Sequence, residues 1–501
     1  MLQPLLRGGL WPLLPALIFL PMALFPPLNQ DVAGVLQFSQ RWLAGEHLYV
    51  DLIDVNPPLI FVLNLLPAAV AAVTPLDAVV ALQVCLLAYG GLCWWLAHRA
   101  RDRAAEGSVE RALLDALPAL FLFAAGYDFG QREHLMAMAA LPYALVAARR
   151  ARGEVPRGRL AVALLAGVAF ALKPHFIGVP ALVELYVLTQ RRRLDDPVPW
   201  LIGGIFAVYL ASLPLLFPAY LQTVLPLAWN LYRELGGATA WQVLTTQRMG
   251  TATALLLPLL WVTWRRRAAA PSAHLPMILA LMAIAALVAA VAQHKGWSYH
   301  ILPLQMFASA LGLALAAQWL DRSAILLNAP RTASALAGLF ALYALANGEA
   351  PWRELAYPHG EVASLETLLQ RVSGQRVLAL SPDVYPIYPA LNYLDEASTL
   401  PAMSTWVLQA SYATCLPGGR HYRDVAEMQP AERSLYREVI EDFVQAPPAA
   451  VLVDSVTGIP WCNGPFDFVD YFRRDPRFAQ VWSRFHMAGE WGRFRLYTPR
   501  S

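Results

Sequence analysis

Residues 274–300 read HLPMILALMAIAALVAAVAQHKGWSYH. No charged residue occurs between Leu275 and Ala292, and an α-helix over these residues would be about 27 Å long. That length is close to the hydrocarbon core of a lipid bilayer, which is roughly 30 Å thick. The polar residues from Gln293 to His300 follow at once. We therefore predict a membrane-spanning helix whose end carries a polar segment at one membrane surface.

Similar apolar runs recur over the first two thirds of the chain. Of the 501 residues, 57% are hydrophobic and only 15% are charged, whereas soluble proteins contain roughly 25% charged residues. The first run, residues 9–27, lacks the small-residue cleavage site that follows a signal peptide, so we expect an uncleaved span. About eleven crossings are predicted, near residues 9–27, 76–98, 112–126, 134–149, 159–175, 177–190, 198–218, 251–264, 274–293, 301–320 and 333–347.

Arginine residues cluster at the ends of apolar runs, in residues 99–111, 149–159, 191–193 and 265–267. Positively charged loops are retained in the cytoplasm, so we expect a cytoplasmic N-terminus. The clusters are divided among short loops and form no single basic face, so a nucleic-acid partner is not predicted. A full crossing by the short apolar run 57–74 would place the first cluster outside. We therefore predict that this run forms a hairpin in the outer half of the bilayer.

The composition changes after residue 347. Residues 1–347 are predicted to form the transmembrane domain, and within it residues 29–75 form the first periplasmic loop. Residues 348–501 contain no run that could span a membrane. Short β-like runs at 376–380, 450–454 and 494–497 alternate there with helix-like stretches at 361–372 and 431–444. The predicted fold class is a polytopic α-helical membrane protein with a C-terminal periplasmic α/β domain.

The four cysteines fall in two different environments. Cys85 and Cys93 lie in a predicted span, where a thiol usually acts as a small hydrophobic side chain. Cys415 and Cys462 lie in the C-terminal domain, which the predicted topology places in an oxidising compartment. We predict that Cys415 and Cys462 form a disulfide.

Most ionisable groups outside the arginine clusters lie at the predicted periplasmic ends of the spans. Such groups are costly at membrane depth and mark functional sites by default. Four segments that are far apart in the sequence contribute them to one membrane face. The candidates are Asp31 and Asp54 in the first loop, Asp128, Arg132, Glu133 and His134 after the third span, Lys173 and His175 after the fifth, and His294, Lys295 and His300 after the ninth.

These residue types suit transfer of a sugar from a lipid phosphate. A carboxylate supplies a general base, and two carboxylates close together can hold a divalent cation. Lysine, arginine and histidine bind phosphate. A hydroxyl that loses its proton to the base would attack the anomeric carbon while the lipid phosphate leaves, which inverts the anomeric configuration. The sequence lacks the Gly-x-x-x-x-Gly-Lys-Ser/Thr loop, which argues against ATP chemistry.

Each candidate also has a purely structural interpretation. Asp31 could cap a helix, and Asp54 could shape a turn. Residues 132–134 could be paired internally at the start of a span. Lys173 could extend toward the membrane interface, and residues 294–300 could belong to an interfacial belt. Four such groups on one face favour a functional site over four separate coincidences.

The first loop resembles that of GT-C glycosyltransferases. The loop contains Asn29-Gln-Asp31, then Gly45-Glu-His-Leu-Tyr49, then Asp54-Val-Asn-Pro-Pro-Leu59. This order is similar to the loop of protein O-mannosyltransferases, the lipid A aminoarabinose transferase and oligosaccharyltransferases. Leu172-Lys-Pro-His175 and the polar stretch 293–300 are similar to further motifs, and the resemblance covers about residues 1–305. The Trp-Trp-Asp signature of oligosaccharyltransferases is not matched, so transfer of a whole oligosaccharide is not expected.

The resemblance implies roles for the candidates. Asp31 would be the catalytic base, and Asp128 is similar to the second acidic residue of these families. The donor phosphate would be bound by Arg132, Lys173, His175, Lys295 and His300. The acceptor would be oriented by Asp54, Glu133, His134 and His294, and the carboxylates could hold a divalent metal ion.

We therefore expect a multi-pass enzyme of the bacterial inner membrane, surrounded by membrane lipids. It would move a hexose or pentose from a polyprenyl-phosphate donor to a periplasmic glycan, lipid or protein. One alternative is a lipid-glycan polymerase or ligase that uses a pyrophosphate-linked donor and basic residues in place of Asp31. Another is a transporter or flippase for a lipid-linked sugar, which would be built from two related halves. No convincing internal repeat is present, and this favours the enzyme.

Overall fold

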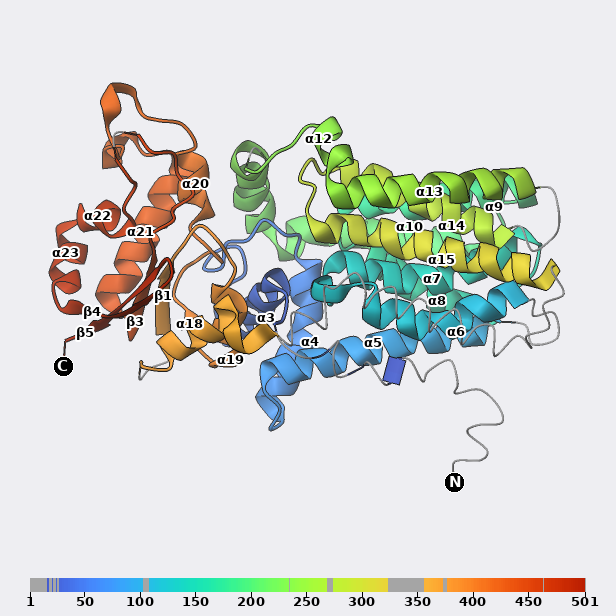
Figure 1. The fold of residues 1–501 in the computed structure, drawn as a ribbon, viewed down its shortest axis with the longest axis horizontal. Helices are drawn as coiled ribbons and strands as arrows, with labels where there is room; N and C mark the ends of the chain where they lie inside the picture. Colours follow the sequence, from blue (N-terminus) through green and yellow to red (C-terminus); the bar gives the residue numbers. More distant parts are fainter. Residues whose placement is uncertain are drawn as a thin grey trace. The chain divides into compact units, whose positions relative to one another are not determined.

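The computed structural model describes residues 16–17, 20, 24, 27–101, 108–233, 235–267, 274–322, 356–372, 376–462 and 464–500 (Figure 1). The predicted span 333–347 and nearly all of the span 9–27 lie outside these residues. The chain divides into two compact units. Unit 1 comprises residues 1–26, 83–212 and 237–354, and unit 2 comprises residues 27–82, 213–236 and 355–501.

Unit 1 is helical, and its helices, except the short α12, coincide with predicted spans. They are α5 (Ala78–Ala100), α6 (Ser108–Phe123), α7 (Arg132–Ala151), α8 (Arg159–Phe170), α9 (Gly178–Arg191), α10 (Pro197–Leu216), α12 (Ala240–Thr245), α13 (Gln247–Arg266), α14 (His274–Ala292) and α15 (Ser298–Arg322). The helices α5 and α10 extend into unit 2 at one end. Within the described ranges, α5, α10, α14 and α15 are long and apolar enough to cross a membrane. The total of eleven crossings stays a prediction.

The helix α7 lies at the centre of unit 1. Every residue of α7 is buried, and α7 packs against α8, α9, α14 and α15. Alanine dominates the facing helix α14, and small side chains allow helices to approach closely. Figure 1 shows these helices running side by side. The two ends of α7 are therefore fixed by its neighbours, which matters because both ends carry charged residues.

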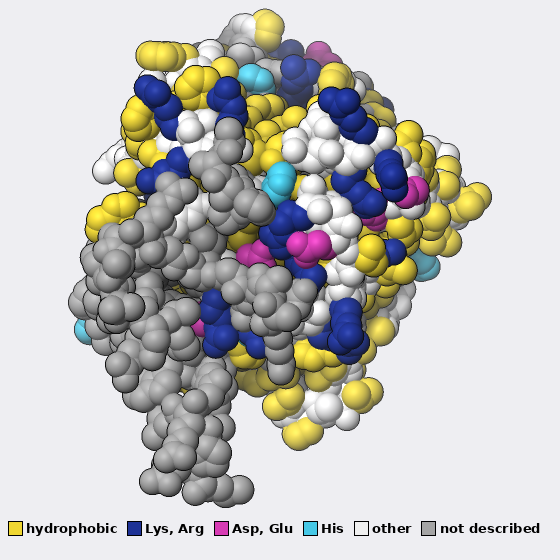
Figure 2. Space-filling view, turned by 90° about the vertical axis from the view of Figure 1, so that its right-hand side faces the viewer, with side chains coloured by type: hydrophobic (Ala, Val, Ile, Leu, Met, Phe, Trp, Pro, Cys, Tyr) yellow, Lys and Arg dark blue, Asp and Glu magenta, His cyan; other side chains and the backbone are white. Residues whose placement is uncertain are grey.

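Basic residues gather at one end of unit 1. The helices α5, α7, α9 and α13 all carry arginine in their last turn, where a cation is favoured by the helix dipole. Figure 2 looks at this end and shows basic side chains with hydrophobic ones around them. One of these arginines, Arg150, is fully buried and binds Glu184 and Asp196. This arrangement agrees with the arginine clusters of the sequence lying on one side of the helices.

Unit 2 begins with two helices of the first loop, α3 (Gln30–Leu43) and α4 (Leu59–Val73). The hairpin predicted for residues 57–74 is wrong, because α4 is one continuous helix with Pro67 inside it. A single proline removes one backbone hydrogen bond and need not reverse the chain. The buried face of α4, which includes Ile60, Phe61 and Asn64, lies at helical spacing, and α4 packs on α3.

The C-terminal part of unit 2 contains a five-stranded mixed sheet. Its strands are β1 (Arg376–Leu380), β2 (Ala397–Ser398), β3 (Ala450–Asp454), β4 (Phe485–Trp491) and β5 (Phe494–Pro499), in the order β2-β1-β3-β5-β4. The pairs β1/β2 and β1/β3 are parallel, and β3/β5 and β4/β5 are antiparallel. All three predicted strand positions are confirmed, as are the predicted helices, which become α18 (Glu361–Leu369) and α21 (Pro430–Gln445).

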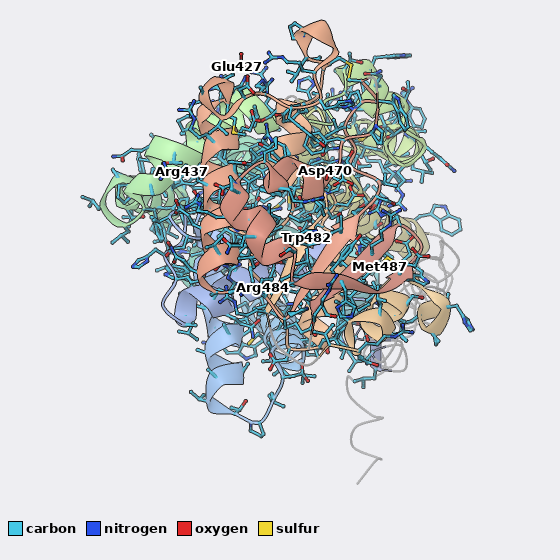
Figure 3. The ribbon with its side chains drawn as sticks, turned by 90° about the vertical axis from the view of Figure 1, so that its left-hand side faces the viewer. Glu427, Arg437, Asp470, Trp482, Arg484 and Met487 are labelled. Atoms are coloured by element: carbon cyan, nitrogen blue, oxygen red, sulfur yellow. A yellow bond between two sulfur atoms is a disulfide. The ribbon has the colours of Figure 1, made fainter. Side chains whose placement is uncertain are left out.

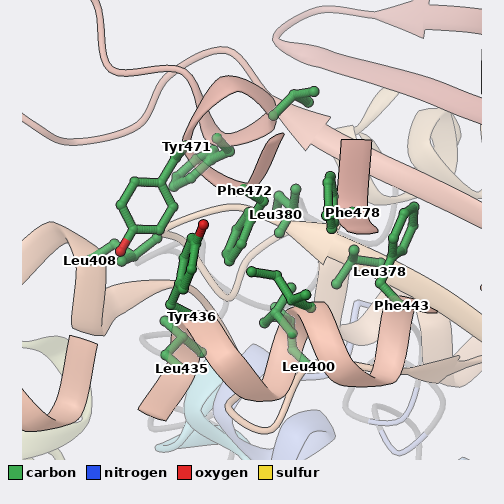
Figure 4. Close-up of a cluster of buried hydrophobic side chains, with 14 of the residues drawn as sticks. Leu378, Leu380, Leu400, Leu408, Leu435, Tyr436, Phe443, Tyr471, Phe472 and Phe478 are labelled. Carbon is green, nitrogen blue, oxygen red and sulfur yellow. The ribbon is translucent and has the colours of Figure 1, made fainter. Parts of the chain in front are cut away.

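A hydrophobic core joins this sheet to its helices (Figure 4). The core side chains labelled there are Leu378, Leu380, Leu400, Leu408, Leu435, Tyr436, Phe443, Tyr471, Phe472 and Phe478. Two further helices, α22 (Phe468–Arg473) and α23 (Pro476–Trp482), contribute aromatic residues. Trp482, labelled in Figure 3, stacks on Phe485 of β4. Each large side chain buried in this way stabilises the fold by roughly 1.5–3 kcal/mol.

Cys415 and Cys462 form a disulfide in the structure, and their Cα atoms are 5.5 Å apart. Cys415 lies in the loop before α21, and Cys462 lies in the loop after β3, so the disulfide joins these two loops. The other two cysteines, Cys85 and Cys93, lie on α5 as free thiols.

Candidate functional site

A buried ion pair lies at the end of unit 1 that is remote along α7 from the arginines. Nζ of Lys173 lies 2.5 Å from Oε1 of Glu133, and both side chains are buried. Glu133 stands in the first turn of α7, where a negative charge is favoured by the helix dipole. Charges are seldom buried unless they are paired. The pair therefore fixes the start of α7 to the segment that follows α8.

The local sequence explains why Lys173 leaves its helix. The sequence predicts one span over residues 159–175, but α8 ends at Phe170, and Pro174 begins a short 3-10 helix, η3 (Pro174–Ile177). A residue that precedes proline is disfavoured in the helical conformation. Lys173 accordingly has an extended backbone, with φ of −142° and ψ of 141°. Because α8 ends before Lys173, the backbone of Lys173 is extended, and its side chain reaches Glu133.

Lys173 also contacts the segment between α14 and α15. Its Nζ donates to Oε1 of Gln293 at 3.4 Å and lies 5.2 Å from the ring centre of Tyr299. These two residues lie near the two ends of the polar stretch that follows the apolar helix α14. Three of the four segments that the sequence predicts to share one face therefore meet at Lys173.

Asp128 joins the same region from the segment before α7. It is buried in the 3-10 helix η2 (Gly126–Asp128), and its Oδ1 accepts a hydrogen bond from Oγ of Ser298 at 3.2 Å. His134 holds this segment in place. Its Nδ1 accepts from the backbone N–H of Gly130, and its Nε2 donates to the carbonyl of Phe121. Both nitrogens of His134 are thus used within the protein.

We call this group the polar cluster. Its members are Asp128, Arg132, Glu133, Lys173, His175, Gln293, Lys295, Ser298, Tyr299 and His300. Electrostatic interactions link the members that share no hydrogen bond. His300 experiences the charges of Arg132, Lys173 and Lys295, and Glu133 experiences those of Arg132 and Lys173. Three basic side chains therefore accompany two carboxylates, and the excess of positive charge favours an anion.

Several polar atoms of the polar cluster are buried without a hydrogen bond. Within the described part of the chain, these atoms include Oε2 of Glu133, Nε2 of His175 and Nδ1 of His300. Leaving a buried polar group unsatisfied costs about 1–3 kcal/mol. A substrate with several oxygens and hydroxyls could satisfy all three atoms. This arrangement is more typical of a binding site than of a purely structural ion pair.

The two lysines of the chain lie directly before η3 and within the polar stretch 293–300. Lys173 and Lys295 are the only two lysines among 38 lysine and arginine residues. The Lys295 ammonium lies 5.5 Å from the ring centre of Trp297. An ammonium is a compact charge whose protonation can be shifted by burial, whereas a guanidinium is a rigid fork that stays charged. This selective use of lysine is a signal that the sequence-based prediction of the site did not use.

His294 lies outside the polar cluster by its contacts. Its side chain is exposed, and its Nδ1 lies 3.1 Å from the backbone carbonyl of Ala238. The backbone N–H of Ala238 in turn donates to the carbonyl of His294. His294 therefore connects the polar stretch to the loop before α12.

The candidates of the first loop belong to unit 2. Asp31 is half-buried at the second position of α3, and the side chain of Asn29 caps this helix by accepting from the Asp31 and Val32 N–H groups. Asp54 is buried, and its Oδ1 accepts from the N–H of Asn56 at 2.7 Å. Asp54 thus shapes the turn before the two prolines.

The described residues contain no group of three or more histidine, cysteine, aspartate or glutamate side chains placed to hold a metal ion. The carboxylates that the sequence suggests as metal ligands are engaged elsewhere. Glu133 binds Lys173, and Asp128 accepts from Ser298. The binding of a divalent metal ion stays a prediction from the sequence.

No family model and no curated protein matches the chain. Comparison with solved structures finds a chain of similar fold. The crystal structure of ArnT from Cupriavidus metallidurans in the apo state is similar over 97% of this chain and 97% of that chain, with a TM-score of 0.57 and 12% sequence identity. ArnT is an aminoarabinose transferase. The resemblance inferred from the sequence motifs is thereby confirmed at the level of the fold.

Proposed function

We propose that this protein is an inverting membrane glycosyltransferase that moves one monosaccharide from a polyprenyl phosphate to an acceptor hydroxyl. The observation that carries the proposal is the buried polar cluster within a fold similar to that of an aminoarabinose transferase. A fold alone hosts many functions. The excess of positive charge and the unsatisfied polar atoms of the polar cluster therefore supply the chemical support.

The polar cluster would bind the donor phosphate. Arg132, Lys173 and Lys295 supply positive charge, and His175 and His300 add ring nitrogens within the same electrostatic group. In the transition state the bond between the anomeric carbon and the phosphate oxygen breaks, and the oxygen keeps the electron pair. Charge therefore develops on the phosphate, where fixed cations stabilise the transition state more than the ground state.

The acceptor would be activated by a carboxylate. We assign the base to Asp31, which takes the proton of the acceptor hydroxyl as the oxygen attacks the anomeric carbon. Glu133 holds Lys173 in place, and Asp128 is the second acidic residue. His134 supports the segment that carries Asp128, and Asp54 supports the turn of the first loop. The products are the glycosylated acceptor and free polyprenyl phosphate.

The proposal places the protein in the bacterial inner membrane. The arginine-rich end of unit 1 would face the cytoplasm, in keeping with the retention of positive loops on that side. The polar cluster and the C-terminal α/β part would face the periplasm, where the acceptor would be a glycan, a lipid or a protein.

The decisive experiment measures the release of polyprenyl phosphate. Purified protein is incubated with polyprenyl-phosphate monosaccharides and a membrane extract, and the products are followed by mass spectrometry. We expect release with one sugar, and loss of release in Asp31→Asn with unchanged expression and thermal stability. Asp77→Asn is a matched control, because Asp77 is exposed and caps the N–H of Val80, a task that asparagine performs equally well.

Two other results would overturn this function. Turnover of a pyrophosphate-linked donor, with Asp31→Asn still active, would identify a polymerase or ligase. Movement of a lipid-linked sugar across a vesicle membrane without release of phosphate would identify a transporter.

The two lysines allow phosphate binding to be tested without turnover. An amine-specific reagent can modify only Lys173, Lys295 and the N-terminal amine, which serves as an internal standard. We expect a polyprenyl monophosphate to slow modification of both lysines but not of the N-terminus. Equal rates with and without the lipid phosphate would contradict the assignment of the polar cluster.

A further inference from the structure

The C-terminal part of unit 2 makes a row of contacts along one side of α3. The contacts begin at Leu28, whose N–H donates to the hydroxyl of Tyr393 at 2.6 Å. The carbonyl of Ala33 then accepts from Nδ2 of Asn392 at 3.0 Å. Nη1 of Arg41 donates to the carbonyl of Leu400 at 2.9 Å. These contacts extend from the residues before α3 to its last turn.

Gln37 lies at the middle of this row and is almost completely buried. Its Nε2 donates to the carbonyl of Glu396 at 2.8 Å. Its Oε1 accepts from the hydroxyl of Tyr388 at 3.0 Å and from the N–H of Ser398 at 3.1 Å. One amide thus bonds to three residues of the segment 388–403, which we call the mooring segment.

The spacing shows that the mooring segment contacts a single face of α3. Ala33, Gln37 and Arg41 are separated by four residues each, and residues four apart lie on the same face of a helix. Gly34 lies next to this face. A Cβ atom added to Gly34 would be 2.6 Å from the sulfur of Met403, so a larger residue here would force the Met403 side chain to move. Close approach therefore accompanies the hydrogen bonds.

A buried amide such as that of Gln37 is costly unless its hydrogen-bond partners are in place. If α3 and the mooring segment needed only to pack against each other, leucine or methionine at position 37 would be buried at a lower free-energy cost than an amide. The Gln37 amide, in contrast, is bonded at both its nitrogen and its oxygen, and satisfied buried polar groups fix one arrangement of the elements that they join. The row thus defines the position and rotation of α3 about its own axis.

We propose that the mooring segment positions Asp31, and that Gln37 and Tyr393 are the positioning residues. Asp31 stands three residues after the Leu28 N–H that Tyr393 holds, and six residues before Gln37. A carboxylate at the second residue of a helix moves with the helix axis. The inference rests on the proposed role of Asp31 as base, and it assigns to the C-terminal α/β part a task other than binding the acceptor.

The first test uses Gln37→Met, which keeps the length of the side chain and removes its hydrogen bonds. Gln40→Met on the same helix is the matched control, because the hydrogen bonds of the row do not involve the Gln40 side chain. Amide hydrogen exchange of the full-length protein is followed for α3 and for α21. Loss of two or more hydrogen bonds should accelerate exchange of α3 by about tenfold or more. Exchange of α21 and of the control should not change.

The second test measures transfer. Displacement of a catalytic group by about 1 Å can reduce the rate about a hundredfold. We expect Gln37→Met to lower kcat by about tenfold to a hundredfold with little change in KM, since the substrate-binding polar cluster is untouched. A purely structural role would lower the amount of folded protein and leave kcat per folded molecule unchanged.

A milder pair of variants covers the case in which Gln37→Met does not fold. Tyr393→Phe removes the oxygen that accepts from Leu28, and Tyr357→Phe removes a hydroxyl that bonds to Glu366 instead. The first should accelerate exchange at the start of α3 and lower kcat, and the second should do neither.

The outcomes separate this inference from the proposed function. Unchanged hydrogen exchange of α3 in both Gln37→Met and Tyr393→Phe would show that the mooring segment does not fix α3, whether or not the protein transfers a sugar. Faster exchange with unchanged kcat would overturn the positioning of Asp31. Absence of transfer in the unaltered protein would instead count against the proposed function, and the exchange measurement needs no substrate.

Discussion

Nζ of Lys173 lies 2.5 Å from Oε1 of Glu133, and the two residues come from segments separated by 40 positions in the chain. Removal of one partner from a buried ion pair typically costs about 3–5 kcal/mol, because the other charge remains buried. We expect Lys173→Met and Glu133→Gln each to lower the free energy of unfolding by about that amount. The double variant should lose less than the sum of the two.

Thermal unfolding of the four proteins in detergent provides this double-mutant cycle. Arg420→Met is the control, because both side chains of the Arg420–Glu427 pair are exposed and such pairs contribute little to stability. Strict additivity of the two single variants would show that the pair is not coupled.

Arg150 provides a prediction about stability alone. Its guanidinium binds both carboxylate oxygens of Glu184, at 2.6 and 2.8 Å, and Oδ2 of Asp196 at 2.6 Å. A lysine cannot reproduce this forked geometry. We expect Arg150→Lys to lower the unfolding free energy by about 3 kcal/mol while the protection of Lys173 by a polyprenyl phosphate is retained.

The exposed Arg192 offers a matched substitution, Arg192→Lys, which should be nearly neutral. Loss of lysine protection in folded Arg150→Lys would contradict the separation of the arginine-rich end from the polar cluster.

Glu396 predicts a pH dependence in unit 2. Burial raises the pKa of this carboxyl from its ordinary value of 4.5 to about 7. Because the folded state holds the proton more tightly than the unfolded state, the stabilising contribution is complete below pH 4.5. It is lost as the pH rises through about 7. We expect Glu396→Gln, which stays neutral, to raise the Tm at about pH 8 and to leave it nearly unchanged at about pH 4.5.

Differential scanning fluorimetry at the two pH values would measure this effect. Glu490→Gln on β4 is the control, because its side chain is exposed. An equal change of Tm for Glu396→Gln at both pH values would argue against a buried neutral carboxyl.

The disulfide predicts the pattern of thiol reactivity. Alkylation of the unreduced, denatured protein should label Cys85 and Cys93 only, and reduction should add Cys415 and Cys462. Replacement of both disulfide cysteines by serine should lower the stability of unit 2 by about 2–4 kcal/mol, because the unfolded chain gains entropy. Four labelled cysteines without reduction would show that the bond does not form in the isolated protein.

The membrane helices were predictable because their sequences are almost entirely apolar, and several of them end in arginine. Apolar residues continue through α14, and the arginines at the ends of α9 and α13 mark their C-terminal ends. The hairpin of residues 57–74 was predicted wrongly because the prediction rested on the balance of charge outside the run. The residues themselves favour a helix, since Pro67 is the only interruption in the sequence of α4.

Part of the polar cluster was predictable because its members are charged and lie at the ends of apolar runs. Their pairing was not. The partners of Lys173 include Gln293 and Tyr299, which are neutral and were not assigned a role. Likewise Gln37 lies in a helix that reads as amphipathic, and only the fold brings residues 388–403 beside it. Long-range hydrogen bonds of neutral side chains leave no periodic pattern in the sequence.

The contacts of α3 with residues 388–403 bear on how proteins of this architecture can be recombined. A boundary drawn at residue 347 looks like a convenient place to exchange one C-terminal part for another. Such an exchange would separate Gln37 from Tyr388 and Ser398, although they are the halves of one interface. Residues 28–41 and the C-terminal part must therefore be exchanged together. A chimaera that keeps this pair from one parent should fold better than one that is cut at residue 347.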